Sequence, residues 1–118
     1  MWMQKFANAA RGIKIAVRGE SSFFVHLFAT TVVVLAGAAL GISRVSWCLL
    51  TLCIAVVLVA EMFNTAIERL SRVVTEEPNP RVRDVLDVCA GAVLLAAIGA
   101  ALVGILLLGH PLLHCLGG

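Results

Sequence analysis

The chain has 118 residues, 61% of them hydrophobic, and its mean hydropathy is +1.03, whereas an average soluble domain is about 45–50% apolar. Its formal charge is only +2, which gives no electrostatic support for a nucleic-acid partner. These values exclude an ordinary soluble domain and a nucleic-acid-binding protein. They predict a single all-α integral membrane domain over residues 1–118.

The first expected element is a helix over about residues 5–20. Apolar residues recur there at three- and four-residue steps from Phe6 to Val17, and basic residues lie mainly on the other side. This pattern predicts an N-terminal amphipathic helix on the membrane surface, with its basic side chains near anionic lipid headgroups. Those side chains are Lys5, Arg11, Lys14 and Arg18.

Three apolar stretches follow, and each approaches the roughly 20 residues needed to cross about 30 Å of hydrocarbon. We expect membrane spans over about residues 25–42, 45–68 and 88–108. Between the last two, Pro78 and Pro80 predict that a helix ends near Thr75 and that another begins around Arg81. In the first span, Gly37 and Gly41 form a small-residue motif that suits close helix packing, within one subunit or between subunits.

The distribution of charge predicts the orientation in the membrane. Basic residues gather in the N-terminal segment and in the stretch from Arg69 to Arg83, whereas the first loop has only Arg44 and no Asp, Glu, Lys or Arg follows Asp87. By the positive-inside rule, the N-terminus and the 69–87 region are cytoplasmic and the C-terminus is outside.

The three histidines are expected to have no catalytic role. His26 begins the first span, where an interfacial hydrogen bond is the expected role. His110 and His114 lie beyond the third span, and Pro111 is expected to disturb the helix between them. We therefore interpret them as C-terminal interface residues rather than a metal-binding pair.

Polar side chains interrupt the second span at positions where hydrocarbon is expected. At 100° per residue, Glu61, Asn64 and Glu68 fall within about 60° of one another on a helix surface. An ionised side chain deep in a bilayer costs roughly 2.5–3.5 kcal/mol on insertion scales. Three polar groups on one face therefore indicate a functional site, and the alternative is a polar seam that holds helices together.

The types of these residues suggest a reaction. Glu61 is the deepest carboxylate and suits a general base. Glu20, at the end of the surface helix, would be a solvated charge if it acted alone, but together with Glu68 it offers two carboxylates for Mg²⁺ near the cytoplasmic interface. Metal-bound phosphate and a buried base beside lipid suggest phosphoryl transfer to a lipid hydroxyl. The sequence contains neither a P-loop nor a protein-kinase glycine loop.

The segment Glu61-Met-Phe-Asn-Thr-Ala-Ile-Glu68 closely resembles the Glu-x-x-Asn-Ser/Thr-Ala-Ile-Glu signature of the small bacterial integral-membrane diacylglycerol kinases, a family that includes the undecaprenol kinases. The resemblance covers nearly the whole chain. Gly12-Ile-Lys14 and Glu20-Ser-Ser-Phe23 resemble the family's entry into the first span. Asp87-Val-Cys-Ala-Gly-Ala-Val-Leu94 resembles its entry into the last span.

This resemblance implies a homotrimer in the bacterial inner membrane, with active sites shared between neighbouring subunits and MgATP bound at the cytoplasmic surface. By matching position, Glu61 would be the general base, and Asn64 would orient it or the γ-phosphate. Glu20 and Glu68 would hold the Mg²⁺ ions that bridge the triphosphate. The remaining nucleotide-contacting positions would be Asn8, Glu77, Pro78, Asn79 and Asp87.

Two positions depart from the family pattern. Leu86 stands where the family usually has a lysine, and loss of that cation should reduce phosphate affinity unless another group compensates. Arg83, one helical turn earlier, is our candidate substitute. The family's basic residue near the N-terminus falls at Met1, and Lys5 is the nearest candidate for it.

Two questions stay open at this level. The acceptor is either diacylglycerol or undecaprenol. The side chains expected to line the lipid cleft are small or apolar, so they do not indicate which of the two lipids is bound. The alternative function is a small proton-coupled exporter that uses Glu61, since an intramembrane glutamate is the usual proton site of such proteins. Such exporters generally have four spans with the acid in the first, whereas this chain has three predicted spans with the acid in the second.

Overall fold

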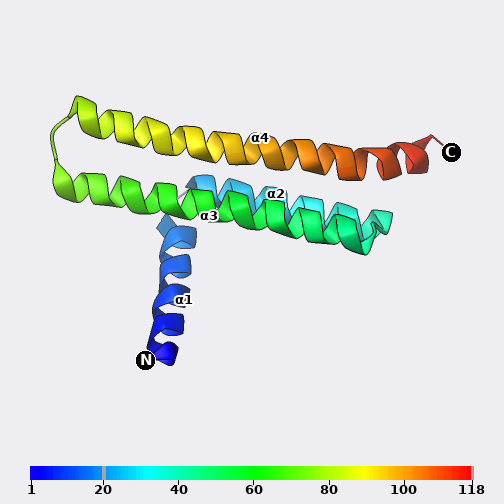
Figure 1. Cartoon of the computed structure of the whole chain (residues 1–118), viewed down its shortest axis with the longest axis horizontal. Coiled ribbons are helices and arrows are strands. Elements are labelled where there is room, and N and C mark those ends of the chain that lie inside the picture. Colours follow the sequence, from blue (N-terminus) through cyan, green and yellow to red (C-terminus); the bar gives the residue numbers. More distant parts are fainter. Residues whose placement is uncertain (20, 118) are drawn as a thin grey trace.

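The computed structural model describes residues 1–19 and 21–117. It consists of helices in this described part, in agreement with the all-α prediction (Figure 1). The elements are α1 (Trp2–Gly19), α2 (Ser21–Leu40), α3 (Arg44–Val74) and α4 (Pro80–Leu116). The three helices after α1 are long and apolar enough to cross a membrane, as the sequence predicted. The protein is therefore a multi-pass membrane protein.

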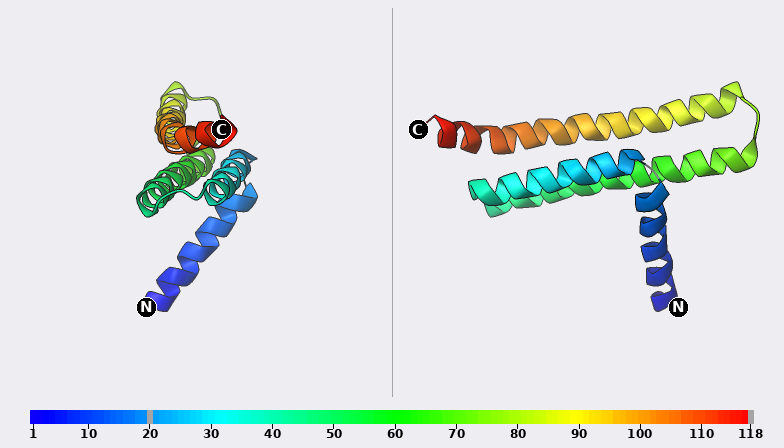
Figure 2. Two further views of the ribbon diagram at one scale, coloured as in Figure 1. Left: turned by 90° about the vertical axis from the view of Figure 1, so that its right-hand side faces the viewer. Right: turned by 180° about the vertical axis from the view of Figure 1, so that it is seen from behind.

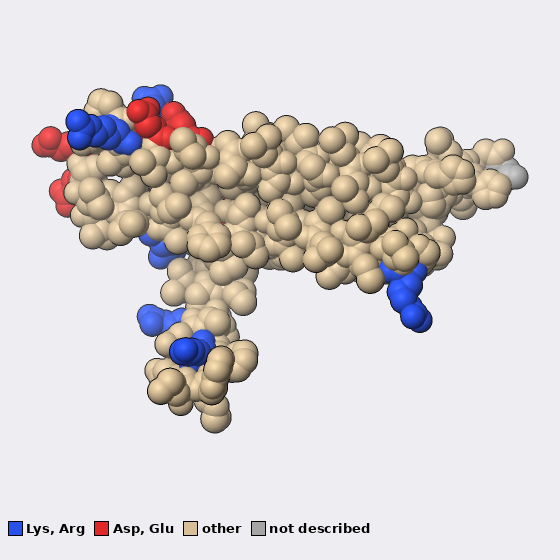
Figure 3. Space-filling view, in the orientation of Figure 1, with Lys and Arg blue, Asp and Glu red and all other residues tan. Residues whose placement is uncertain are grey.

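The two longest helices, α3 and α4, lie side by side and antiparallel, and α2 runs along the N-terminal part of α3 (Figures 1 and 2). The first helix, α1, projects away from this bundle. At 1.5 Å per residue, α3 is about 46 Å long and α4 about 55 Å, so both exceed the roughly 30 Å of bilayer hydrocarbon. Charged side chains gather where α3 and α4 are joined, and the broad middle of the bundle shows none on the visible face (Figure 3).

The turn between α2 and α3 explains the small-residue motif of the first span. Gly41 has φ +65°, a left-handed conformation that glycine adopts without strain. A Cβ atom on Gly37 would lie 3.0 Å from the ring of Trp47 and 3.0 Å from Ile42 Cδ1. Ser43 then caps α3, because its hydroxyl accepts a hydrogen bond from the Ser46 N–H at 3.2 Å. Within one subunit, Gly41 thus allows the turn and Gly37 allows the close contact with Trp47.

The connection between α3 and α4 follows the predicted proline signals. The second long helix ends at Val74, with Thr75 as its C-cap, which confirms the end predicted near Thr75. Asn79 caps α4 by accepting a hydrogen bond from the Arg81 N–H at 2.9 Å, and Pro80 occupies the first turn.

The disturbance expected at Pro111 does not end the last helix. The last helix continues through Pro111 to Leu116, and the rings of His110 and His114 stack with centroids 6.5 Å apart. Proline removes only one backbone donor, the one that would bond the carbonyl of Leu107. Membrane helices tolerate this loss because neighbouring groups and local adjustment satisfy the carbonyl.

The buried stripe of α3 changes from apolar to polar along its length. Its buried residues are Leu50, Val57, Glu61 and Thr65, which follow one another at seven- and four-residue steps. The first two line an apolar cavity, whereas the last two are a buried carboxylate and a buried hydroxyl. The polar residues of the site thus follow the apolar part of this stripe.

Candidate active site

Glu61 is the most deeply buried acidic residue of the described chain, with 2% of its surface exposed. It lies about 26 Å along α3 from Arg44, close to the end of a roughly 30 Å hydrocarbon layer. Its Oε2 lies 3.3 Å from Nε2 of His26 on α2, within ion-pair distance. The Thr65 hydroxyl donates a hydrogen bond to the Glu61 carbonyl at 3.0 Å, so the adjacent buried polar group is satisfied within the helix.

The next turns of α3 carry the amide and the second carboxylate of the predicted site. The Asn64 Nδ2 donates a hydrogen bond to Oε1 of Glu68 at 2.9 Å, and both side chains are half-buried. The predicted proximity of these two residues is therefore present. The other amide atom, Asn64 Oδ1, is buried and has no hydrogen-bond partner in the described part of the chain. Buried polar atoms are normally paired, so an unpaired oxygen at such a place is suited to a ligand.

The donor set fits a hard cation such as Mg²⁺. The unpaired amide oxygen of Asn64 and the Glu68 carboxylate belong to two side chains that are joined by a hydrogen bond, and both are oxygen ligands of the kind Mg²⁺ prefers. Within the described residues no group of three or more His, Cys, Asp or Glu side chains comes together. Mg²⁺ usually takes only one or two protein carboxylates and completes its shell with water and phosphate. Glu20, the other predicted ligand, lies outside the described residues.

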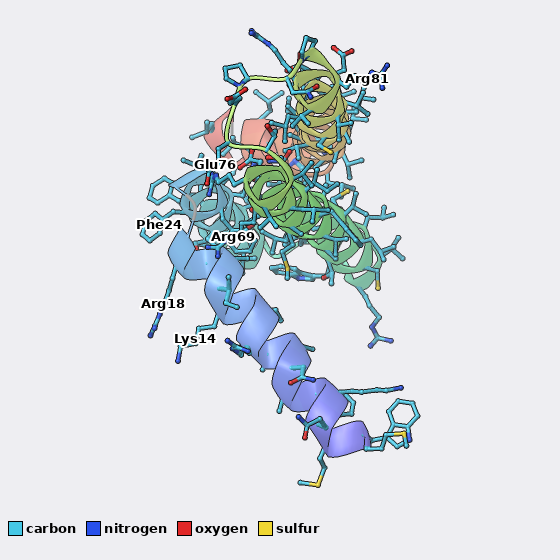
Figure 4. The ribbon with its side chains drawn as sticks, turned by 90° about the vertical axis from the view of Figure 1, so that its left-hand side faces the viewer. Lys14, Arg18, Phe24, Arg69, Glu76 and Arg81 are labelled. Carbon is cyan, nitrogen blue, oxygen red and sulfur yellow. The ribbon has the colours of Figure 1, made fainter. Side chains whose placement is uncertain are left out.

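A hollow of about 590 Å³ lies at the α3–α4 connection, and we call it the polar hollow because most of the residues that line it are polar or charged. It gathers four of the predicted nucleotide-contacting residues, namely Glu77, Pro78, Asn79 and Arg83. Arg72 and Leu86 also line it, so two arginines line the same hollow as the position that departs from the family pattern. Figure 4 looks onto this end of the molecule, with Glu76 in the connection and Arg81 at the start of α4.

Two further predicted residues lie apart from this hollow. Asn8 is exposed in the middle of α1, which projects from the bundle. Asp87 is exposed on α4, directly after Leu86. Neither is among the described residues that line the hollow. The single chain thus gathers the loop residues and Arg83 in one hollow and pairs Asn64 with Glu68, but Asn8 joins neither group.

An apolar cavity of about 480 Å³ lies between α2, α3 and α4. His26 lines it, as do Val33, Val57 and, toward the C-terminal part of α4, Leu108. Small side chains of α4 open the space: Ala97, Ala100, Ala101 and Gly104. Since His26 also contacts Glu61, the cavity adjoins the buried carboxylate.

Sequence reasoning missed His26 and Arg72. His26 was expected only to make an interfacial hydrogen bond, but the structure places it against Glu61. Arg72 was used only to predict orientation, yet it lines the polar hollow. A histidine near the start of an otherwise apolar span was the available signal for the first. For the second, the signal was that Arg72 follows Glu68 by one helical turn.

Comparison with known proteins gives consistent matches. Residues 7–108 match the family model described as prokaryotic diacylglycerol kinase. The undecaprenol kinase of Bacillus subtilis is 30% identical over 106 residues, which cover 90% of this chain and 86% of that protein. The diacylglycerol kinase of Synechocystis sp. is 34% identical over 109 residues, covering 92% of this chain and 62% of that longer protein. No solved structure matches the chain.

Proposed function

The chain belongs to the prokaryotic diacylglycerol kinase family and is a lipid kinase, and on this premise we propose that it transfers the γ-phosphate of MgATP to the hydroxyl of diacylglycerol or undecaprenol. One observation carries the proposal beyond family membership. A buried carboxylate, Glu61, contacts His26, which lines an apolar cavity, and the Asn64–Glu68 pair begins three residues later on the same helix. The hydrocarbon chain of a lipid acceptor suits the apolar cavity, and the phosphate with its metal ion suits the polar pair.

Glu61 is the proposed general base. In the transfer, the acceptor hydroxyl gives its proton to the Glu61 carboxylate, and its oxygen forms a bond to the γ-phosphorus as the bond from that phosphorus to ADP breaks. The burial of Glu61 supports this role, because it keeps bulk water away from the base and so limits hydrolysis as a competing reaction.

Asn64 and Glu68 are proposed to act on the phosphate side, and Glu20 is proposed to join Glu68 as a metal ligand. When bound, Mg²⁺ would neutralise charge on the triphosphate. The unpaired Asn64 Oδ1 supports this assignment, since it is a buried acceptor that the described chain leaves unsatisfied. The hydrogen bond from Asn64 Nδ2 to Glu68 fixes the amide so that this oxygen keeps a defined direction.

The polar hollow is the proposed nucleotide-binding surface. Glu77, Pro78 and Asn79 form its loop wall, and Arg83 contributes a cation. Arg83 is proposed to replace the lysine that Leu86 lacks, because a guanidinium binds phosphate oxygens through two parallel hydrogen bonds. Asn8 and Asp87 are proposed to reach the nucleotide from α1 and from the start of α4.

We propose that the protein functions as a homotrimer with shared active sites in the bacterial inner membrane, with a cytoplasmic N-terminus. Among the described residues α4 has none that is buried, so most of its apolar surface is available to lipid or to a neighbouring subunit. The first helix is proposed to lie on the membrane surface, where Lys14 and Arg18, which extend from it in Figure 4, would meet lipid headgroups.

A transfer assay tests this function. Purified protein in mixed micelles is given γ-labelled ATP and Mg²⁺, with diacylglycerol and undecaprenol offered in separate reactions. Label in one lipid, and its loss when EDTA removes the metal, is the expected result, and the labelled lipid identifies the acceptor. Folded protein that labels neither lipid would refute the proposal and return attention to a proton-coupled exporter.

A further inference from the structure

We propose that His26 is a positioning residue that holds the Glu61 carboxylate at the end of the apolar cavity, where the acceptor hydroxyl arrives. This inference rests on the proposed function, because it assigns a role in the same reaction. It adds a residue from α2 to a site whose other described members all come from α3, the loop, α4 and α1.

The contact itself links two helices across the interior. His26 Nε2 lies 3.3 Å from Glu61 Oε2, and the two side chains are 22% and 3% exposed, respectively. A pair at this depth is little screened by solvent, so the imidazole and the carboxylate constrain each other more than a surface pair would. The contact therefore restricts the carboxylate, which otherwise turns easily about its last side-chain torsion.

His26 is also the polar end of the apolar cavity. Thr30 also lines the cavity, but its hydroxyl donates a hydrogen bond to the His26 carbonyl at 2.8 Å. The remaining lining is apolar except for Cys53, which behaves as a small hydrophobe. A hydrocarbon chain lying in the cavity would thus meet its first strongly polar group at the imidazole, directly beside Glu61.

These two facts place His26 on the acceptor side of the site. The polar hollow, which is the proposed nucleotide-binding surface, is lined by residues from Ser71 to Leu86, and His26 is not among them. Loss of His26 should therefore affect the transfer step and leave ATP binding intact. Displacement of a catalytic group by about 1 Å can cost about 10²-fold in rate, which sets the expected scale.

The kinetic test compares His26→Leu, which removes the ring nitrogens, with His26→Gln, which keeps an N–H donor. We expect His26→Leu to lower kcat about 10²-fold while the KM for ATP stays within about twofold. His26→Gln should recover at least about tenfold of that loss. The matched control is His114→Leu, at the exposed far end of α4. Wild-type kcat in His26→Leu, or a rise in the KM for ATP that accounts for the loss, would overturn the proposal.

A spectroscopic measurement covers the case in which His26→Leu fails to assemble. The chain has only three histidines, so ¹⁵N-histidine labelling gives a spectrum in bilayers that can be assigned with His26→Gln. We expect Glu61→Gln to shift the side-chain ¹⁵N signal of His26 and to leave those of His110 and His114 unchanged. An unmoved His26 signal would overturn the proposal.

The two measurements also separate this inference from the function on which it rests. If the wild-type protein labels no lipid, the proposed function fails and the catalytic role of His26 fails with it, even if the ¹⁵N shift shows that the pair exists. If the wild type is active but His26→Leu is equally active, only the inference about His26 fails.

Discussion

Replacing Asn64 with leucine should separate activity from stability, because the two polar atoms of this side chain have opposite effects on folding. Asn64 Nδ2 donates a 2.9 Å hydrogen bond to Glu68, and a bond to a charged group contributes about 1.5–3 kcal/mol. Its Oδ1 is buried without a partner in the described chain, which costs about 1–3 kcal/mol. Leucine removes both terms, so the free energy of unfolding should change by no more than about 2 kcal/mol.

Activity should respond much more strongly. If the unpaired Asn64 Oδ1 binds the metal ion or orients the phosphate, its loss removes a fixed electrostatic contact in the transition state. Such losses typically reduce kcat by about 10²–10³-fold. Asn64→Leu is thus expected to assemble normally and to be nearly inactive.

The assay combines unfolding by SDS in mixed micelles with the lipid-labelling assay. Tryptophan fluorescence is a suitable probe of unfolding, because the Trp47 ring packs against Gly37. Thr31→Val is the matched control, since its exposed hydroxyl is already bonded to the Leu27 carbonyl in the same helix and lies away from the carboxylates. A loss of more than about 3 kcal/mol in Asn64→Leu, with specific activity preserved, would show that Asn64 is structural and refute the reasoning.

Three other changes test separate parts of the account. Glu68→Gln should raise the Mg²⁺ concentration for half-maximal activity about tenfold or more; an unchanged Mg²⁺ titration would remove Glu68 as a ligand. Arg83→Ala should raise the KM for ATP, whereas Arg81→Ala, outside the lining of the polar hollow, should not. Equal effects of the two substitutions would show that Arg83 does not replace the family lysine at the position of Leu86. Gly37→Ala should destabilise the protein by about 1–3 kcal/mol through overpacking against Trp47. Gly99→Ala, which meets nothing within 4 Å, should not destabilise it in SDS titration; equal losses would argue against the packing.

The elements were predictable because their signals are local. Hydropathy identifies long apolar helices without knowledge of their neighbours, and prolines mark the α3–α4 connection directly in the sequence. The helical period likewise places Glu61, Asn64 and Glu68 on one face. The continuation of α4 through Pro111 was not predictable from the same rule, because it depends on whether one unpaired carbonyl can be satisfied.

The contacts between helices were not predictable from such signals. The period of α3 does not indicate which α2 residue faces Glu61, so the His26 partner emerged only from the packing. Nor does it indicate that Asn64 bonds Glu68 rather than Glu61, because that choice depends on side-chain rotamers. The Gly37 and Gly41 motif suited packing within or between subunits, and the geometry of Trp47 and of the turn shows contacts within one subunit.

The central claim is that Glu61 accepts the proton of a lipid hydroxyl during phosphoryl transfer. The most direct test is to measure label transfer from γ-labelled ATP to the preferred lipid by Glu61→Gln, alongside the binding of ATP by the same purified variant. The account predicts that ATP binding and assembly persist while transfer falls by at least about 10²-fold. Transfer at the wild-type rate in an assembled Glu61→Gln protein would contradict it.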